Sequence, residues 1–426
     1  MGFASEWLER NALFPAKIKE APDKQTAIII VVPAFNEPDI TSLLDSLAAC
    51  SEPDCNTEVI IVINAPVNSS EESIRNNKLC IRNIESWKKV HKKCFFRLFY
   101  FDAGDHGIKD WGAGLSRKAG MDEAVRRFDA VDSPAGVIVA LDADCTVESN
   151  YFTEICDNLF KKKEHKACSI YFEHPLSGEA FPEIIYRYIT LYELHLRYYL
   201  RCLVYTGFPY AVHTVGSCMA CKALPYIKSG GMNRKQAGED FYFIQKLIPA
   251  GGYFTLNSTT VYPSPRLSMR VPFGTGATLS RMMDNNEESL LTYNIKAFRD
   301  LQLIFQNVKD YFHFSSRELE GFYSNLPWSV RSFMKKEEWT DTLMQIQDNT
   351  AGEESFRKRF FMWFNMFRIV KYLNYVHAGI YDKLPVTAAG REYLILAGQN
   401  IESDDARTLL KVFRKIEKQQ FSYSSC

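Results

Sequence analysis

The sequence lacks the features of several protein classes. Its 51 Lys and Arg residues are balanced by 51 Asp and Glu residues, so it has no basic excess of the kind that nucleic-acid-binding proteins use. It has no run of 18 apolar residues long enough to cross a membrane. Its first residues, MGFASEWLERNALF, contain no apolar signal-peptide core. We therefore expect a cytoplasmic protein with no transmembrane segment and no nucleic-acid partner.

Cysteines at metal-binding spacing are almost absent. The chain has 11 Cys, and the closest pair is Cys218 and Cys221, with no second pair at zinc-finger spacing. Two buried thiols in a reducing cytoplasm are the simpler interpretation of this pair, and a metal or redox site is the alternative.

The first part of the sequence instead alternates between strand and helix patterns. Apolar, β-branched runs predict strands that are buried on both faces, as in parallel sheets. Amphipathic spacing predicts helices between them. The predicted strands are 26–32, 59–63, 95–101 and 136–141, and the predicted helices are 39–49, 71–93 and 115–128. This order indicates an α/β fold, a three-layer domain with a mainly parallel sheet.

The strand pattern ends near residue 280. Helices are predicted at 184–205 and, beyond the boundary, at 293–312, 355–381 and 404–420. We expect an N-terminal extension (1–25), an α/β domain (26–280) and a C-terminal helical domain (281–426). Residues 357–376 are basic and aromatic. A buried helix is the simpler interpretation of them, and peripheral contact with the inner membrane face is the alternative.

Two acids directly follow one of the predicted strands. Asp142 and Asp144 come after the strand 136–141, and ligands in open α/β sheets bind at the carboxyl ends of strands. Close carboxylates repel each other unless a cation neutralises them, and oxygen ligands suit Mg²⁺ or Mn²⁺. The pair at a strand end suggests a metal ion held against a diphosphate. Taken alone, without other motifs, the two acids also fit a solvated loop.

Three other motifs accompany this pair in a fixed order. Pro33–Glu37 (PAFNE) follows the first strand, Gly112–Gly120 (GAGLSRKAG) opens a helix after the third, and Gly238–Asp240 (GED) precedes a helical pattern. As a set, across residues 26–265, they resemble the family 2 glycosyltransferases, which have the GT-A fold. The resemblance implies an inverting enzyme that moves a sugar from a UDP- or GDP-linked donor to a hydroxyl of a sugar, lipid or small-molecule acceptor.

The resemblance also implies roles for single residues. Asp144 would reach the metal, and Asp142 would hold the metal or the ribose. Arg117 would meet the nucleotide or its phosphates, which suits a planar cation near a helix start. Asp240, with Glu239 beside it, would be the general base that deprotonates the acceptor. The segment that would line the nucleotide pocket comprises Pro33, Ala34, Phe35 and Glu37.

The sequence departs from the family pattern in two places. The second strand ends at Asn64, where one or two aspartates are common, and since Asn can pair with either base edge, uracil and guanine both stay open. The segment TTVYPSPR lacks a histidine that many members use as a metal ligand. Metal binding would therefore rest on Asp144, the diphosphate and water.

Two loops contain further candidates. His213 and Ser217 precede the Glu239–Asp240 motif, where related enzymes line the acceptor pocket, although a structural histidine is the simpler interpretation. Arg266 and Arg270 lie in a loop rich in Ser and Pro. That loop is predicted either to cover the diphosphate or an acidic acceptor, or to be a rigid linker.

Two other functions compete with the transferase. A sugar-phosphate nucleotidyltransferase usually has a glycine-rich phosphate loop after its first strand, but this place holds Ala34-Phe-Asn-Glu37. A catalytically silent nucleotide-sugar-binding scaffold would have no reason to keep Asp142, Asp144, Arg117 and Asp240 together. The transferase is therefore the leading hypothesis.

Overall fold

The computed structural model describes residues 2–104, 111–234, 238–267 and 274–419, which pack as two compact units. Unit 1 contains the chain up to Tyr186, Thr214–Arg281 and the end of the last helix from Glu417. Unit 2 contains Arg187–His213 and Met282–Ile416. Residues 187–213, which lie within the range predicted for the first domain, thus belong to unit 2. The domain boundaries themselves stay a prediction.

Unit 1 is built on a mixed sheet of eight strands in the described part of the chain, in the order β3-β2-β1-β4-β7-β6-β8-β5. The strands β3, β2, β1 and β4 are parallel, β7 is antiparallel to both of its neighbours, β6 and β8 are parallel, and β5 is antiparallel to β8. The strand bounds are β1 Thr26–Ala34, β2 Asn56–Ile63, β3 Phe96–Asp102, β4 Val137–Ala140, β5 Thr146–Val147, β6 Ala167–Phe172, β7 Met219–Lys222 and β8 Tyr253–Tyr262. This confirms the predicted α/β fold with a mainly parallel sheet.

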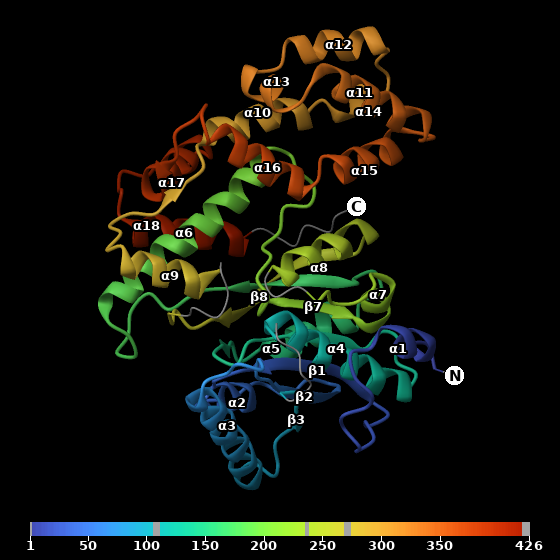
Figure 1. Ribbon diagram of the computed structural model, residues 1–426, viewed down its shortest axis with the longest axis vertical. Coiled ribbons are helices and arrows are strands. Elements are labelled where there is room, and N and C mark those ends of the chain that lie inside the picture. Colours follow the sequence, from blue (N-terminus) through green and yellow to red (C-terminus); the bar gives the residue numbers. More distant parts are fainter. Residues whose placement is uncertain (1, 105–110, 235–237, 268–273, 420–426) are drawn as a thin grey trace. The chain divides into compact units, whose positions relative to one another are not determined.

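Helices cover both faces of the parallel part of the sheet. Figure 1 shows α2 (Thr41–Ala48) and α3 (Glu71–Val90) on one face, with α4 (Ala113–Ala130) and α1 (Ser5–Asn11) on the other. Because both faces are covered, β1 and β2 are almost entirely buried, which explains their continuous β-branched sequences.

The end of the first strand differs from the prediction. We expected Pro33 to end the first strand, but β1 continues to Ala34, and Pro33 lies opposite Val62 of β2. The ladder between β1 and β4 ends at Val31. The missing N–H of Pro33 therefore interrupts no bond to β4.

Three short strands, β5, β6 and β7, were not predicted, and β7 contains part of the Cys218–Cys221 motif. Both of these thiols are buried, and neither is in a disulfide. No group of three or more His, Cys, Asp or Glu side chains within the described ranges is placed to hold a metal ion. The burial expected for the two thiols is thus observed.

Charged residues on α4 anchor the N-terminal segment. Backbone N–H groups of that segment donate to three carboxylates of the helix: Ala4 to Asp129 (2.6 Å), Leu13 to Asp122 (3.0 Å) and Ile18 to Glu123 (3.1 Å). Such charge-assisted bonds satisfy buried carboxylates without exposing them to water. The segment before β1 is thus packed on unit 1 along α4.

Removing one buried charge of α4 should destabilise unit 1. Arg127 donates to both oxygens of Glu58, a residue of β2 whose side chain is 1% exposed. We expect Arg127→Met to lower the free energy of unfolding by about 3 kcal/mol, because it leaves a buried carboxylate without its main partner. Urea denaturation measures this. The control is Arg126→Met on the same helix, where the Arg126 side chain is 27% exposed. It should cost less, because its partner Glu123 still accepts from the backbone N–H groups of Lys17 and Ile18. Equal losses for the two variants would contradict the expectation.

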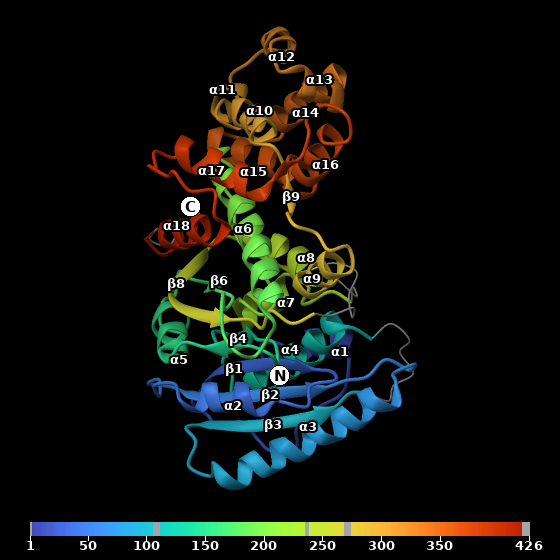
Figure 2. The ribbon, with the colours of Figure 1, turned by 90° about the vertical axis from the view of Figure 1, so that its left-hand side faces the viewer.

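Unit 2 is helical, as predicted for the C-terminal region. Most of α6 (Glu183–Tyr205) belongs to unit 2 and lies beside the other helices of that unit (Figure 2). In the part of the chain that the structure describes, no helix has both the length and the apolarity to span a bilayer. The remaining helices of this region are α10 Ile295–Phe305, α11 Val308–Tyr311, α12 Ser316–Ser324, α13 Trp328–Phe333, α14 Lys336–Asp348, α15 Glu353–Trp363, α16 Met366–Val376, α17 Val386–Leu396 and α18 Ala406–Gln419.

Two helices predicted as continuous are each split in two. The range 293–312 forms α10 and α11, and the range 355–381 forms α15 and α16. The second break is set by Asn365, whose side chain accepts from the backbone N–H of Arg368 and so starts a new helix. The basic, aromatic segment 357–376 therefore buries apolar side chains from both helices, including Phe360 and Tyr372.

Candidate functional site

Four segments of unit 1 bring the predicted acids and arginines together. Asp142 and Asp144 follow β4, and Glu37 follows β1, the parallel neighbour of β4. Glu239 and Asp240 open α8 (Glu239–Leu247) after Gly238, which has a left-handed backbone (φ 69°). Arg266 follows β8. Carboxyl ends of adjacent parallel strands meet at one edge of a sheet, which is the usual ligand position in such folds.

Arg117 links two of these segments. It lies on the second turn of α4 and is 4% exposed. Its Nη2 donates to Asp142 Oδ1 (2.5 Å), and its Nη1 donates to Glu239 Oε1. A planar guanidinium can bridge two carboxylates at a fixed angle. Arg117 therefore ties the acids after β4 to the start of α8.

The charges of this cluster shift one another's pKa. Burial lowers the pKa of Arg117, but the carboxylates of Asp142, Glu239 and Asp240 outweigh burial and raise it above the ordinary value. Burial raises the pKa of Glu239 and of Asp240, and Arg117 opposes both shifts. Arg117 thus stays charged, and Asp240 lies close enough to Arg117 and Asp142 to respond to their charges.

A second arginine holds the other two acids. Arg266 donates to both carboxylate oxygens of Glu37 through its Nη atoms, and its Nε lies 2.7 Å from Asp144 Oδ2. Arg266 is far from Glu37 and Asp144 in the sequence, so the loop after β8 must fold back over the ends of β1 and β4. Arg266 thus places a positive charge directly against Asp144.

The surroundings of Asp144 raise the pKa of its carboxylate. Burial, with the nearby carboxylates of Asp142 and Glu37, raises its pKa to about 6, although Arg266 lowers it. The oxygen donors are of the type that Mg²⁺ and Mn²⁺ prefer. In the described ranges they do not form a set of three that could hold an ion by itself. These residues therefore fit a divalent ion whose remaining ligands come from a bound diphosphate or water.

The turn after β1 depends on a residue that was not among the predicted site residues. Asn36 has a left-handed backbone (φ 55°), a conformation that Asn tolerates better than most residues. Its N–H donates to Asn77 Oδ1 (2.9 Å), and Asn76 Nδ2 donates to Asn36 Oδ1 (2.7 Å). This turn directs Glu37 towards Arg266. The signal in the sequence was an Asn in a short turn directly after a buried strand.

Asn64 is buried at the end of β2 and has three protein partners. With its amide nitrogen towards Ala34 O (3.1 Å) and Ser116 Oγ (3.0 Å), its oxygen accepts from Trp111 Nε1 (3.1 Å). These bonds join the ends of β1 and β2 to the start of α4. A contact between Asn64 and a nucleobase stays a prediction. Of the other predicted pocket residues, Ala34 is buried, and Pro33 and Phe35 are half-buried.

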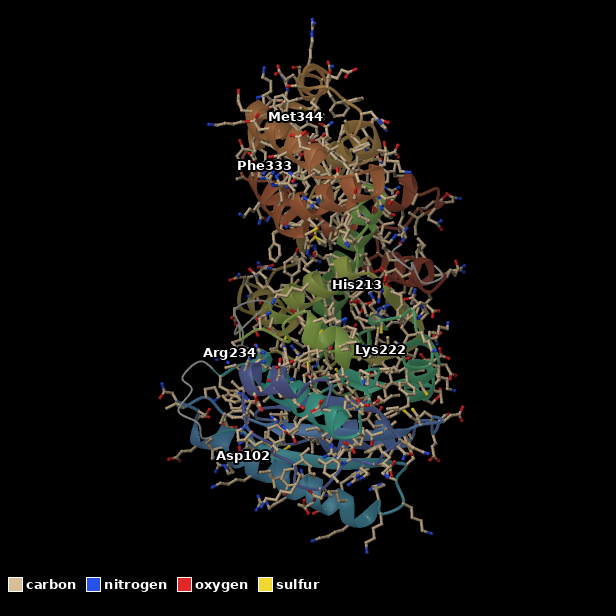
Figure 3. All side chains as sticks on the ribbon, turned by 90° about the vertical axis from the view of Figure 1, so that its right-hand side faces the viewer. Asp102, His213, Lys222, Arg234, Phe333 and Met344 are labelled. Carbon is tan, nitrogen blue, oxygen red and sulfur yellow. The ribbon has the colours of Figure 1, made fainter. Side chains whose placement is uncertain are left out.

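Two of the remaining candidates, Ser217 and His213, lie in described segments of different units. Ser217 is buried, with its Oγ 3.5 Å from Cys218 Sγ. His213 (Figure 3) belongs to unit 2, whereas the site lies in unit 1. Arg270 lies outside the described residues. Asp102, also labelled in Figure 3, accepts from the N–H of Gly104 (2.8 Å), as in a plain turn after β3.

A glycine that the sequence did not single out packs against Arg117. A Cβ atom added at Gly216 would lie 2.5 Å from Arg117 Nη1 and 2.6 Å from its Cζ. These distances are far below van der Waals contact, so only a residue without a side chain fits there. Gly216 thus allows the backbone before β7 to lie against the guanidinium.

Gly216→Ala should disturb Arg117 without changing a charge. We expect a loss of about 1–3 kcal/mol in the free energy of unfolding, because the guanidinium must leave Asp142 or Glu239. Gly321→Ala is the control. It makes the same change on the exposed face of α12, where a Cβ meets nothing within 4 Å, and should raise stability slightly. Urea denaturation measures both variants, and an unchanged stability of Gly216→Ala would refute the tight contact.

Comparisons with known proteins give weak likenesses. No family model matches the sequence, and no curated protein does. Among solved structures, residues 1–349 of S. aureus TarS with UDP-GlcNAc match 78% of this chain and 89% of that chain, at 13% identity and a TM-score of 0.38. Glucosyl-3-phosphoglycerate synthase from Mycobacterium tuberculosis, with Mg²⁺ and UDP, matches 54% of this chain and 69% of that chain, at 13% identity and a TM-score of 0.32. With TM-scores below 0.5, these likenesses assign neither a family nor an activity.

Proposed function

We propose that unit 1 transfers a sugar from a nucleotide diphosphate sugar to an acceptor hydroxyl, with inversion at the anomeric carbon. The observation that carries this proposal is the bridge made by Arg117. It joins Asp142, beside Asp144 at the end of β4, to Glu239, next to Asp240. Arg117 thereby holds in one cluster the two acids proposed to face the phosphates, Asp142 and Asp144, and the acid proposed to take the proton, Asp240.

Asp240 is the proposed general base, and Glu239 is the positioning residue. The Glu239 carboxylate is buried against Arg117, whereas Asp240 is half-buried and its Oδ1 accepts from the N–H of Phe241 (2.7 Å). The raised pKa of Asp240 suits a base that must take a proton near neutral pH. Asp240 takes the proton of the acceptor hydroxyl. The acceptor oxygen then bonds to the anomeric carbon, and the bond from that carbon to the diphosphate breaks.

On the side of the sugar away from the proposed base Asp240, positive charge stabilises the leaving diphosphate. A divalent ion bound at Asp144, with Asp142 beside it, would neutralise the charge that grows on the leaving oxygen. Arg266 lies against the same carboxylate and supplies a fixed positive charge there. A sugar bound between Asp240 and the diphosphate would be attacked on the face opposite the leaving group, which would invert the configuration.

A thermal-shift screen tests the donor class and the metal together. The full chain is heated with UDP, GDP and their sugars, each with and without Mn²⁺. Ligands that bind the folded state raise Tm, by an amount that depends on concentration relative to Kd. We expect one base to stabilise the protein and Mn²⁺ to increase the shift. Absence of any shift with nucleotides or their sugars at millimolar concentration would overturn the proposal.

Metal binding should depend on pH through Asp144. Its carboxylate is charged above its pKa of about 6 and protonated below it, and only the charged form binds a divalent ion. Between pH 7.5 and pH 5.5 we expect the Mn²⁺ affinity to fall about fourfold. Calorimetry with a saturating nucleotide sugar measures this, since that diphosphate does not titrate in the range. Asp144→Asn is the control and should bind weakly at both pH values. A constant affinity in the parent protein would exclude Asp144 as the ligand.

A further inference from the structure

Two cysteines far apart in the sequence lie in contact at one side of unit 1. Cys55, just before β2, and Cys156, at the end of α5 (Tyr151–Ile155), have sulfur atoms 3.2 Å apart. A disulfide has a bond of about 2.05 Å, so the two sulfurs need to approach by roughly 1.2 Å. Both thiols are free in this structure.

A shared lysine holds the two cysteine-bearing segments together. Lys161 Nζ lies 3.0 Å from Asp54 Oδ2 and 2.7 Å from Asp157 Oδ1, and each aspartate is the chain neighbour of one cysteine. The lysine reaches both because residues Cys156–Phe160 form a π-helix, in which Lys161 N bonds to Cys156 O (2.9 Å). The contact between the thiols is therefore reinforced by a second set of interactions.

The two thiols differ in exposure and in acidity. Cys55 is half-buried and can meet a small reagent, whereas Cys156 is 1% exposed. The hydrogen bond from Cys55, together with the charge of Lys161, lowers the pKa of Cys156 against the effect of burial. The same hydrogen bond, with burial, raises the pKa of Cys55. A lowered thiol pKa favours the nucleophilic thiolate. The pair thus combines an accessible thiol with a nucleophilic one.

We propose that Cys55 and Cys156 form a reversible disulfide by exchange with a low-molecular-weight disulfide. The accessible Cys55 thiol attacks the reagent as it gives up its proton, which gives a mixed disulfide and releases one small thiol. The Cys156 thiolate then attacks the Cys55 sulfur, forms the protein disulfide and displaces the second small thiol. Both protein sulfurs are oxidised, the reagent is reduced to two thiols, and the protons pass to them. This proposal does not depend on the proposed transferase function.

Other cysteines of the described part are less suited to this exchange. Cys145, Cys168, Cys218 and Cys221 are buried, so that a reagent cannot reach them. Cys94 is half-buried, like Cys55, but makes no thiol contact within the described ranges. Cys94 is therefore a matched control: it should form a mixed disulfide and keep it.

The test uses the full chain and oxidised glutathione. After incubation, free thiols are alkylated and peptides are mapped by mass spectrometry without reduction. We expect a linked peptide that contains Cys55 and Cys156, and we expect dithiothreitol to remove it. Because the bridge closes a loop of 101 residues, oxidation should raise Tm by about 5 °C.

Three variants separate the steps. Cys156→Ser should keep glutathione on Cys55, Cys55→Ser should give neither the linked peptide nor the Tm shift, and Cys94→Ser should behave as the parent. Should Cys156→Ser fail to fold, Cys55→Ser at its half-exposed position carries the test. The proposal is overturned if the parent retains glutathione on Cys55, or if Cys94 reacts while Cys55 does not.

Discussion

Asp240→Asn should lower the rate of sugar transfer by about 10²–10⁴-fold and leave nucleotide binding within about twofold of the parent. An amide cannot take the proton of the acceptor hydroxyl, whereas the side-chain oxygen of Asn can still accept from the N–H of Phe241, as Asp240 does. The start of α8 should thus keep its geometry. Initial rates at saturating donor, with calorimetry for the nucleotide, measure the two effects.

The control for this variant is Asp341→Asn, the same change at an exposed position of α14. It should leave both the rate and the binding unchanged. If Asp240→Asn lowered nucleotide binding as well as the rate of transfer, Asp240 would be needed for the structure of the site and would not be shown to act as the base. If it kept the parent rate, another group would have to be the base.

Arg117→Met should have the largest effect on stability within the site. Arg117 is buried and donates to two carboxylates, of which Glu239 is only 4% exposed. Its removal leaves a buried acid without its cation, which costs about 3–5 kcal/mol. Urea denaturation measures this loss, and calorimetry should show weaker nucleotide binding because Asp142 and α8 are no longer held together.

Two companion variants test the cause of this effect. Arg117→Lys keeps the charge but not the planar fork, so it should recover only part of the stability. Adding Glu239→Gln to Arg117→Met removes the unpaired charge and should restore about 1–2 kcal/mol. If the double variant were less stable than Arg117→Met alone, unpaired charge on Glu239 would not be the source of the loss.

The sequence alone predicted the main elements of unit 1. The runs TAIIIVV and VIIVI predicted strands buried on both faces, because their apolar β-branched residues leave no polar face. The acids at 142, 144, 239 and 240 were found because each follows a strand or opens a helix, and local patterns identify such places. The breaks in the helices at Asn307 and Asn365 were missed, because an Asn inside an apolar helical pattern does not reveal whether it caps a new helix.

The partners of these acids were decided only by the tertiary structure. Arg117 and Glu239 are 122 residues apart, and Arg266 and Glu37 are 229 apart. No local pattern pairs them, because each contact depends on where a loop crosses the end of the sheet. The same holds for Gly216, which matters only because Arg117 lies against it, and for the contact between Cys55 and Cys156. The sequence by itself determined which chemical groups stand at the ends of strands and helices. The packing of distant segments decided which charges neutralise one another, since electrostatic pairing depends on distance in space.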